Sequence, residues 1–543
     1  MADMAVGGRT RRDFLRRVGQ AGGAGALLAT MGALDLALTS DSPVQPFKPP
    51  HKEDLNLTGR SAKSVVILGA GVAGLACAYE LGKAGYACTV LEAQDRVGGR
   101  NFTVRGGTKH TDLDGKAQTA AFAPGQYLNA GPARIAQWML TMDYCRELGV
   151  PLEMIANVNA DAYFYQEGAG MTPGHPVRRR QVKADMFGYI SELLAKATDK
   201  GALDQLMTGD DKDSLLDFLT QFGNIGKRIP GNPGASFAYT GGPRRGYTTW
   251  PGAAGTPGVV AGPPPSLATV FAYEVGEELS FETDFEQAMV MMQPVGGMDA
   301  IPEALARAIG APKIQLGCPV TGITNGPDRV SVTYRDAAGQ EKQLETDFCI
   351  ATLPPNVLAR IPHNLGPDVT RALTSYQQER VDKIGLEYRS RWWETDHRIY
   401  GGITETDLDL GQVWYPSHGF GTATGVLLGY YNTGDDADAY TRLSLPARQA
   451  RAIEQGVKIH GPKYRSELAS SFSIAWSRVP FIEGGWQDIP GGPDAPVYAP
   501  LNNGVGRVYF AGDWLSYMVS WMHGSFTSAQ KTVTALHSRA AAT

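Results

Sequence analysis

The sequence predicts an α/β fold built on a parallel sheet. A short run of β-branched residues at 64–68 leads into a glycine-rich turn, and an alanine-rich helical pattern follows at 73–83. A second apolar run at 88–91 completes a strand–helix–strand unit, whose two strands are expected to lie parallel in one sheet. Near the other end of the chain, a strand at 507–513 is again followed by a helical pattern, at 524–539.

Composition excludes several other classes of protein. The chain has 543 residues, 43% of them hydrophobic, which is enough for several domains with large cores. With a formal net charge of −5, the chain lacks the positive electrostatic field that drives nucleic-acid binding. We therefore expect no nucleic-acid partner. None of its five cysteines forms a CxxC pair or lies near a histidine at zinc spacing, so we expect buried thiols and no metal site.

The first residues have the features of a targeting segment. Arg11 and Arg12 precede two apolar positions, and a weak apolar stretch at 18–38 follows, interrupted by Asp35. This stretch is too weak to predict a stable membrane span. The pattern resembles a bacterial twin-arginine export signal. We therefore expect a signal segment at 1–39, contact with the twin-arginine translocase during export, and a periplasmic or secreted protein.

The first strand–helix–strand unit carries a GxGxxG motif at its first turn. Gly69 suits the tight turn, Gly71 allows a pyrophosphate to approach the backbone, and Gly74 allows the helix to pack closely on the strand. The helix N-terminus offers unpaired N–H groups to phosphates. Glu92, at the end of the second strand, is placed to accept a hydrogen bond from a ribose hydroxyl. These features predict a Rossmann-like, dinucleotide-binding domain.

The residues after Glu92 narrow the choice of dinucleotide. The segment 92–100 contains Arg96, Gly99 and Arg100, and it resembles the extended fingerprint of the flavin-dependent amine oxidase family. The Gly512-Asp513 pair resembles that family's C-terminal motif, although many members have Glu where this chain has Asp513. The resemblance implies FAD, with Asp513 near its ribityl hydroxyls and Val320 near its adenine. The full set of implied cofactor contacts is Gly69, Ala70, Gly71, Gly74, Glu92, Ala93, Arg96, Gly99, Arg100, Gly131, Pro132, Ala133, Arg134, Val320, Gly512, Asp513, Trp521 and Met522.

Other motifs resemble those of L-amino-acid oxidases within this family. Arg134, in the segment 129–134, matches the arginine that binds the substrate carboxylate, for which its planar guanidinium is well suited. The resemblance implies that the hydroxyl of Tyr415 is a second donor to that carboxylate. It implies that Lys383 holds a water molecule near the flavin. Ser520 would offer its carbonyl to the amine, and Trp521 would form one wall of the site.

The resemblance also implies a division into domains. Residues 40–61 are expected to be a linker, and residues 156–284 a helical lobe with a Gly/Pro-rich loop at 223–265. A mixed-sheet substrate-binding domain would be formed by 101–155 and 361–499. The FAD-binding domain would be discontinuous, formed by 62–100, 285–360 and 500–540.

The expected function is FAD-dependent oxidation of L-amino acids by dioxygen, with release of 2-oxo acids, ammonia and hydrogen peroxide. Three alternatives stay open: an amine or polyamine oxidase, an amino-acid dehydrogenase or monooxygenase of the same fold, and a flavoprotein without catalytic activity. The FAD is expected to be non-covalent because no cysteine follows Cys349. The preferred side chain and the oligomeric state, monomer or homodimer, are left open at this point.

Overall fold

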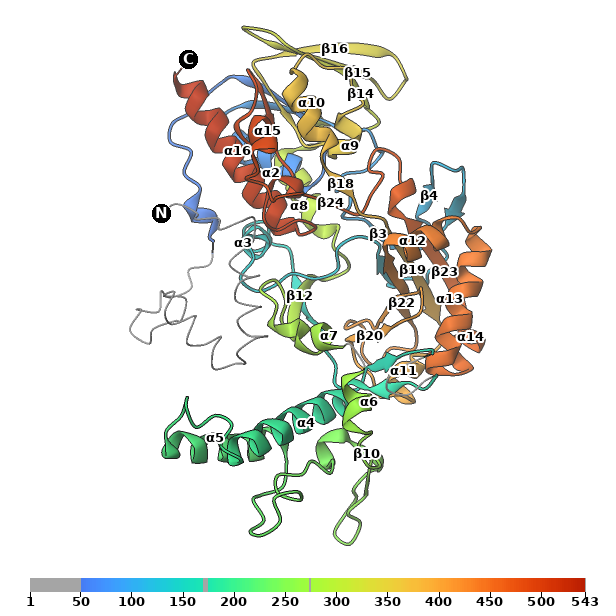
Figure 1. Cartoon of the computed structure of the whole chain (residues 1–543). Helices are drawn as coiled ribbons and strands as arrows, with labels where there is room; N and C mark the ends of the chain where they lie inside the picture. Colours follow the sequence, from blue (N-terminus) through green and yellow to red (C-terminus); the bar gives the residue numbers. More distant parts are fainter. Residues whose placement is uncertain (1–49, 169–173, 273–274, 543) are drawn as a thin grey trace. The chain divides into compact units, whose positions relative to one another are not determined.

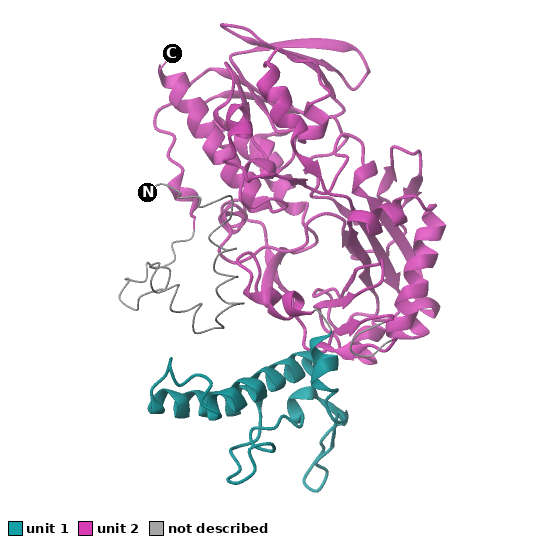
Figure 2. Cartoon of the chain, viewed as in Figure 1, with its two compact units in different colours: residues 1–48, 180–273 teal, residues 49–179, 274–543 magenta. Residues whose placement is uncertain are grey.

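The computed structural model describes residues 50–168, 174–272 and 275–542 (Figure 1). The chain divides into two compact units (Figure 2). The smaller unit contains residues 180–273, and the larger unit contains 49–179 and 274–543, apart from the residues just excluded. The predicted signal segment at 1–39 lies outside the described residues.

A five-stranded parallel sheet forms one half of the larger unit. Its order is β13-β2-β1-β17-β25, and all four neighbouring pairs are parallel. The predicted α/β class is therefore confirmed. The strands are β1 (Ser64–Leu68), β2 (Ala87–Leu91), β13 (Ile314–Gln315), β17 (Phe348–Ala351) and β25 (Val508–Phe510). They come from three distant parts of the chain, as the discontinuous domain requires.

Both faces of this sheet are covered. On one face, the side chains of Val65 and Ile67 pack in a core with α2 (Val72–Lys83), α8 (Ala300–Ile309) and α16 (Met522–Ala542). On the other face, Val66 and Leu68 pack toward a three-stranded antiparallel sheet and short helices. These elements are β14 (Val320–Asn325), β15 (Val330–Arg335), β16 (Glu341–Thr346), α9 (Pro355–Leu358), α10 (Pro367–Thr374) and α15 (Ala499–Asn503). The alternation of side chains along β1 thus fixes which layer each residue enters.

A seven-stranded mixed sheet forms the other half of the larger unit. Its order is β23-β19-β22-β21-β20-β8-β9, with only the β20–β8 pair parallel. The strands are β8 (Tyr163–Tyr165), β9 (Val177–Arg178), β19 (Val381–Tyr388), β20 (Ile403–Thr406), β21 (Gln412–Trp414), β22 (Gly425–Thr433) and β23 (Leu468–Ala475). One face packs on helices α12 (Gly434–Thr441), α13 (Leu445–His460) and α14 (Lys463–Ser466). The opposite face packs partly against apolar residues of the segment 102–130, and its residues Val381, Lys383 and Tyr431 line a cavity.

The smaller unit is built on two helices. Helix α4 (Arg179–Asp199) starts at the boundary with the larger unit, and the Thr208 hydroxyl caps α5 (Gly209–Gly223) by accepting a hydrogen bond from the Asp211 amide N–H. The Gly/Pro-rich stretch at 223–265 is an ordered loop, in which buried Arg245 forms an ion pair with Asp185 of α4 at 2.7 Å. The helical lobe is thus shorter than predicted, because β8 and β9, within residues 163–178, belong to the mixed sheet.

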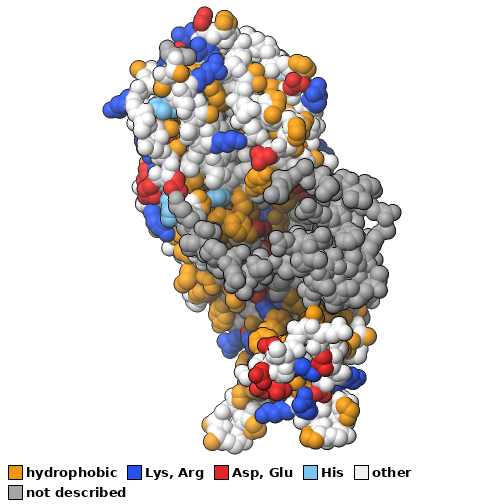
Figure 3. Space-filling view, turned by 60° about the vertical axis from the view of Figure 1, so that its left-hand side comes forward, with side chains coloured by type: hydrophobic (Ala, Val, Ile, Leu, Met, Phe, Trp, Pro, Cys, Tyr) orange, Lys and Arg blue, Asp and Glu red, His pale blue; other side chains and the backbone are white. Residues whose placement is uncertain are grey.

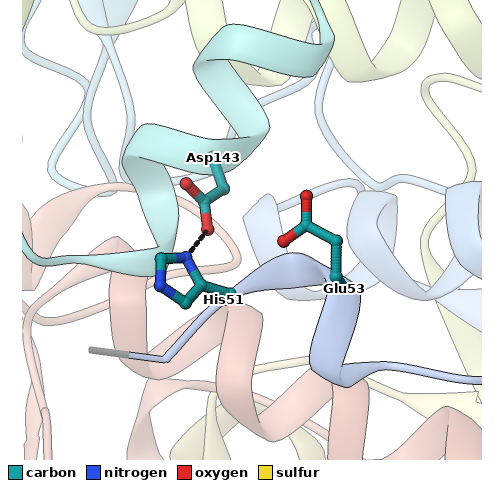
Figure 4. A group of neighbouring side chains, drawn as sticks. All are labelled: His51, Glu53 and Asp143. Carbon is teal, nitrogen blue, oxygen red and sulfur yellow. Dashed lines mark ion pairs between the residues drawn. The ribbon is translucent and has the colours of Figure 1, made fainter. Parts of the chain in front are cut away.

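Smaller elements connect the two sheets and cover their edges. Two-stranded pairs join β3 (Thr103–Arg105) to β6 (Tyr127–Asn129), β4 (Lys109–Thr111) to β5 (Ala117–Thr119), and β7 (Leu152–Ala156) to β12 (Val290–Pro294). His51 Nδ1 lies 3.4 Å from a carboxylate oxygen of Asp143 in α3 (Leu140–Glu147), close to Glu53 (Figure 4). This contact ties the first described residues to the larger unit.

On the described part of the face shown in Figure 3, Lys and Arg side chains are interspersed with Asp and Glu. None of the helices in the described residues is long and apolar enough to cross a membrane.

Candidate active site

The glycine-rich turn after β1 creates a place where a ligand can approach the backbone. Gly69 has a φ of +100°, which favours glycine, and a Cβ on Gly74 would lie 2.0 Å from the Gly69 carbonyl oxygen. A Cβ on Gly71 would meet nothing within 4 Å, because this residue faces a groove at the N-terminus of α2. The space and backbone conformation at the three glycines fit the roles that the motif predicts, and contact with a pyrophosphate stays a prediction.

This groove continues into a second cavity. Both are lined by Arg100, Asn101, Trp486, Asp513 and Ser525, which mark where they meet. Of the predicted cofactor contacts, the groove near the glycine turn is lined by Gly69, Gly71, Glu92, Ala93, Gly99, Arg100, Gly512 and Asp513. The second cavity is lined by Gly131, Pro132, Ala133, Arg134, Trp521 and Met522. A ligand as long as FAD fits the space formed by the two adjoining cavities.

Four predicted cofactor contacts lie behind the lining. Ala70 is buried, and Gly74 packs against the turn. Arg96 stacks on the ring of Phe102 at 4.1 Å, and Val320 begins β14. Burial lowers the pKa of Arg96 to about 10, so its guanidinium remains charged at neutral pH. None of these four residues lines the groove, and their contact with the cofactor stays a prediction.

Glu92 holds the glycine turn in place. One carboxylate oxygen accepts a hydrogen bond from the Ala70 amide at 2.6 Å, and the other accepts one from the Gln94 amide at 2.8 Å. Burial raises the pKa of Glu92, and these two amides together with Arg96 oppose that rise. Each oxygen keeps further acceptor capacity for a ribose hydroxyl.

Asp513 and Arg100 form an ion pair at the junction of the two cavities. The second carboxylate oxygen of Asp513 accepts a hydrogen bond from the Ser520 amide N–H at 3.0 Å. The guanidinium of Arg100 donates a hydrogen bond to the Gly485 carbonyl oxygen at 2.9 Å. Ser520 has a φ of +69°, a conformation rare for a non-glycine residue, and the hydrogen bond to Asp513 holds it there. The family resemblance implies that Arg100 and Asp513 each contact the cofactor. It does not predict the ion pair between them.

Lys383 projects from β19 into the second cavity. Its Nζ donates to the Gly131 carbonyl at 2.6 Å and lies 4.5 Å from the centre of the Tyr431 ring. Burial, with a smaller contribution from Arg134, lowers the pKa of Lys383 to about 7. A Cβ on Gly131 would lie 1.8 Å from the Arg100 carbonyl oxygen, so this acceptor position requires glycine.

Replacing Lys383 by methionine is expected to stabilise the protein. In the folded protein, Lys383 loses its proton near pH 7, whereas in the unfolded chain it does so only near pH 10.5. Between these two pH values the unfolded chain therefore binds one proton more than the folded protein. The free energy of unfolding of the wild type therefore rises with pH in this window, by up to about 1.4 kcal/mol per pH unit. Lys383→Met lacks this dependence, so its advantage is largest below pH 7 and shrinks toward pH 10.

Melting temperatures of both proteins from pH 6 to pH 10 test this expectation. Lys109→Met, at an exposed position of β4, is the matched control and should show no such pH-dependent difference. A Lys383→Met protein that is less stable than the wild type at pH 6 would contradict the buried, weakly solvated environment described for this amine.

Arg134 lies in a box of aromatic rings. Its guanidinium carbon is 4.5 Å from the centre of the Trp414 ring, 5.2 Å from that of Phe281 and 5.9 Å from that of Trp521. Its Nη1 donates to Asn157 Oδ1 at 2.8 Å. Burial lowers its pKa to about 10, so it stays charged at neutral pH. Within the part of the chain that the structure describes, no carboxylate forms an ion pair with it. This is a suitable site for a carboxylate ligand.

The prediction for Tyr415 is wrong. Its side chain is buried, and its hydroxyl is hydrogen-bonded to Thr404 at 2.8 Å and to His460 at 2.5 Å, away from the cavity. Successive residues of a strand point to opposite faces, so Trp414 faces Arg134 while Tyr415 enters the core beneath the sheet. The tyrosine that lines the cavity is Tyr431, on β22.

Several lining residues were missed by the sequence analysis. They are Asn101, Val381, Trp414, Tyr431, Trp476, Gly485, Trp486 and Ser525. Tyr430 packs on the helix-covered face of β22, so its neighbour Tyr431 points the other way, but the sequence does not show which of the two adjacent tyrosines takes which face. The tryptophans carried no distinguishing pattern in the sequence.

The positions of the cysteines indicate whether the cofactor could be bound covalently. All five are buried, and none lines either cavity among the described residues. We therefore expect non-covalent FAD. Acid precipitation of the purified protein should release all of the yellow colour into the supernatant, whereas colour that stays in the washed pellet would show a covalent bond.

Fold and site together define a flavin-dependent amine oxidoreductase. The sequence profile of the family described as "Flavin containing amine oxidoreductase" matches residues 72–537, so the chain belongs to this family, and its cofactor is FAD. Among curated proteins, the L-amino-acid oxidases of Bothrops pauloensis and Gloydius blomhoffii are each 26% identical to it. The first match covers 88% of this chain and 89% of the relative, and the second covers 86% and 87%.

Solved structures show the same fold. Cyclohexylamine oxidase from Brevibacterium oxydans superposes with a TM-score of 0.57 at 18% identity, covering 88% of this chain and 99% of that one. Putrescine oxidase bound to putrescine superposes with a TM-score of 0.56, also at 18% identity and with the same coverage. At this identity the likeness concerns the fold alone.

Proposed function

We propose that the protein oxidises L-amino acids with dioxygen, giving 2-oxo acids, ammonia and hydrogen peroxide. The observation that carries this proposal is Arg134, a cation that lines the cavity beside Lys383 and has no carboxylate partner among the described residues. An α-carboxylate would complete this site with a charge-assisted, bidentate contact. The named L-amino-acid oxidases, which are similar over most of the chain, support the same reading.

The residues of the cavity would bind and orient the substrate. Arg134 would hold the carboxylate, and the hydroxyl of Tyr431, which lines the same cavity, would be the second donor. Trp414 and Trp521 form two walls of the site. These walls would fix the position of the substrate Cα and exclude water. The carbonyl of Ser520, which lines the same cavity, would accept a hydrogen bond from the amine. The groove and cavity residues, among them Gly71, Arg100 and Asp513, would hold FAD, which would supply a hydride acceptor for Cα that dioxygen can reoxidise.

Lys383 would organise water beside the reacting carbon. Its pKa of about 7 means that the amine is largely neutral in mildly basic solution. A neutral Nζ keeps its hydrogen bond to the Gly131 carbonyl and can accept one from a water molecule, whereas the ammonium form can only donate. The same water could hydrolyse the imino acid after oxidation.

An oxidase of simple amines is the second candidate function. The similar solved structures are of enzymes named for cyclohexylamine and putrescine, neither of which carries a carboxylate. A substrate of that kind would leave the charge of Arg134 unpaired in a desolvated site, which is costly. An amino-acid dehydrogenase or monooxygenase would use the same substrate contacts and differ only in how the flavin is reoxidised.

One screen separates these candidates. Purified, yellow protein is mixed with each of the twenty L-amino acids, with cyclohexylamine and with putrescine, and peroxide release is followed. We expect peroxide with at least one amino acid and none above background with the two amines. If a simple amine exceeds every amino acid, the proposal fails. Flavin bleaching by an amino acid without peroxide would instead indicate a dehydrogenase.

We propose that the enzyme is exported through the twin-arginine pathway, which carries folded proteins and so suits a chain that must bind FAD first. The support is the paired-arginine sequence at 11–12. In a bacterial host with this pathway, Arg11→Lys combined with Arg12→Lys should leave active enzyme in the cytoplasm. Comparison of oxidase activity in cytoplasmic and periplasmic fractions measures this, and unchanged export of the double variant would refute the proposal.

A further inference from the structure

Asn157 is the hydrogen-bond partner of Arg134. It follows directly after β7, is only 2% exposed, and does not itself line the cavity. Its Oδ1 accepts a hydrogen bond from Arg134 Nη1 at 2.8 Å. Arg134 is half-buried and lines the cavity, and its Nε and Nη2 donate to none of the residues that the structure describes. One arm of the guanidinium is therefore held by Asn157, and the remaining N–H groups are left for a ligand.

The surroundings of Asn157 fix which atom of its side chain faces Arg134. Its Nδ2 donates to the Ala288 carbonyl oxygen at 3.0 Å and to Gln287 Oε1 at 3.2 Å. Its backbone N–H donates to the Met289 carbonyl oxygen at 2.9 Å, which joins it to the segment before β12. A rotated amide would set Nδ2 against a guanidinium donor and Oδ1 against the Ala288 carbonyl, and neither pair can form a hydrogen bond. Oδ1 is thus held toward Arg134 as a neutral acceptor.

The aromatic rings around Arg134 do not fix the direction of its N–H groups. Trp414, Phe281 and Trp521 lie 4.5, 5.2 and 5.9 Å from the guanidinium carbon. These contacts attract the cation as a whole, so they are not directed at one particular N–H group. A hydrogen bond is directional and therefore orients the group within its own plane. Two-point binding of a carboxylate depends on that orientation, so the contact with Asn157 prepares the anchor.

The charge of Arg134 is left unmatched because its partner is an amide. Burial lowers its pKa, and Tyr431, Glu405 and Glu286 oppose that shift electrostatically. Within the described residues, none of these groups forms an ion pair with it. An aspartate in place of Asn157 would have nearly the same shape but would neutralise the guanidinium at hydrogen-bond distance. A substrate carboxylate would then meet a matched cation with a negative charge beside it, which is unfavourable in a desolvated site.

We propose that Asn157 is a positioning residue that makes the site selective for a carboxylate: it orients Arg134 and, being neutral, leaves the positive charge to the substrate. This inference rests on the proposed function, and it assigns a residue that does not line the cavity to the recognition of the α-carboxylate. The alternative is a purely structural role, since the two Nδ2 hydrogen bonds also tie the end of β7 to the segment before β12.

Benzoate and benzamide are a matched pair of probes that separates these roles. The two molecules have nearly the same shape, but only benzoate carries a carboxylate. Binding to the flavin-loaded enzyme is followed by the change in flavin absorbance. We expect the wild type to bind benzoate at least about tenfold more tightly than benzamide, because only the carboxylate makes a charge-assisted contact with Arg134. Equal affinities in the wild type would overturn the inference.

Asn157→Asp is the decisive variant. It should weaken benzoate binding by about thirtyfold or more and change benzamide binding less than about threefold, because the new carboxylate takes the charge of Arg134. The KM for the best amino acid should rise with the loss of benzoate affinity. A structural defect would instead weaken both probes alike, and that result would refute the inference. Asn56→Asp, at an exposed position of the larger unit, adds the same charge and should change neither affinity.

Asn157→Ala tests orientation apart from charge, and it remains informative if Asn157→Asp does not fold. The guanidinium keeps its charge but loses one hydrogen bond. Benzoate affinity should therefore fall by about three- to tenfold, and benzamide affinity by less than about twofold. Unchanged benzoate affinity in this variant would show that Asn157 does not orient Arg134, against the inference.

These experiments also separate the inference from the proposed function. If the wild type oxidises amino acids but folded Asn157→Asp keeps its preference for benzoate, the inference fails while the proposed function stands. If the wild type oxidises only simple amines, both fail.

Discussion

Arg134→Met is expected to lower kcat/KM for the best amino acid by about tenfold to a few hundredfold while FAD stays bound. A charge-assisted hydrogen bond contributes about 1.5–3 kcal/mol, and a bidentate guanidinium–carboxylate contact reaches at least the upper end. Methionine keeps much of the length and the packing against Trp414 and Phe281 but removes the charge. Poor placement of Cα would lower kcat as well, since a shift of about 1 Å can cost a hundredfold.

Steady-state kinetics together with flavin absorbance measure this effect. The variant should also lose most of its preference for an amino acid over the corresponding amine. Near-normal kcat/KM in a flavin-loaded Arg134→Met protein would rule out Arg134 as the carboxylate anchor and remove the main support for an amino-acid substrate.

Two tyrosines provide a matched pair within this experiment. Tyr431→Phe removes a hydroxyl from the cavity and should lower kcat/KM by about three- to twentyfold, less than Arg134→Met, because one neutral donor is lost. Tyr415→Phe removes a hydroxyl bonded to Thr404 and His460 in the core. It should lower the melting temperature but change kcat/KM less than twofold. The reverse pattern would restore Tyr415 as the second donor.

Gly74→Ala is expected to yield protein with little bound FAD. The added Cβ would lie 2.0 Å from the Gly69 carbonyl oxygen and 2.8 Å from Thr352 Oγ1, and a backbone carbonyl cannot move aside without displacing the glycine turn. Overpacking of this kind costs about 1–3 kcal/mol or more. The shift would move Gly71 and the N-terminus of α2, which form the pyrophosphate site. The ratio of flavin to protein absorbance after purification measures the loss.

Gly82→Ala is the control in the same helix. A Cβ at Gly82 would meet nothing within 4 Å, and alanine favours the helical conformation by about 1 kcal/mol over glycine. This variant should retain full flavin content and equal or greater stability. Normal flavin content in Gly74→Ala would show that the turn can adjust, against the close packing described here.

The features that depend only on residues close together in the chain could be predicted from the sequence. The apolar run of β1, the glycines at 69, 71 and 74, and Glu92 lie within one strand–helix–strand unit, so their roles follow from local geometry. The parallel sheet and the FAD cofactor followed from this unit and its resemblance to the amine oxidase family. The positions of Lys383 and Arg134 were also indicated, because each belongs to a recognisable local motif.

Which side chains meet across the fold was decided only by the tertiary structure. Arg100 and Asp513 are more than 400 residues apart, and their ion pair depends on β25 joining the same sheet as β1. The sequence predicted Tyr415 as the second donor, whereas Tyr431 lines the cavity with Arg134. Which one faces Arg134 depends on strand register, where a displacement of one residue moves a side chain to the opposite face. The registers of three separate strands likewise place Lys383 beside Tyr431 and Tyr431 beside Gln412, and pairing between distant strands leaves no local trace in the sequence.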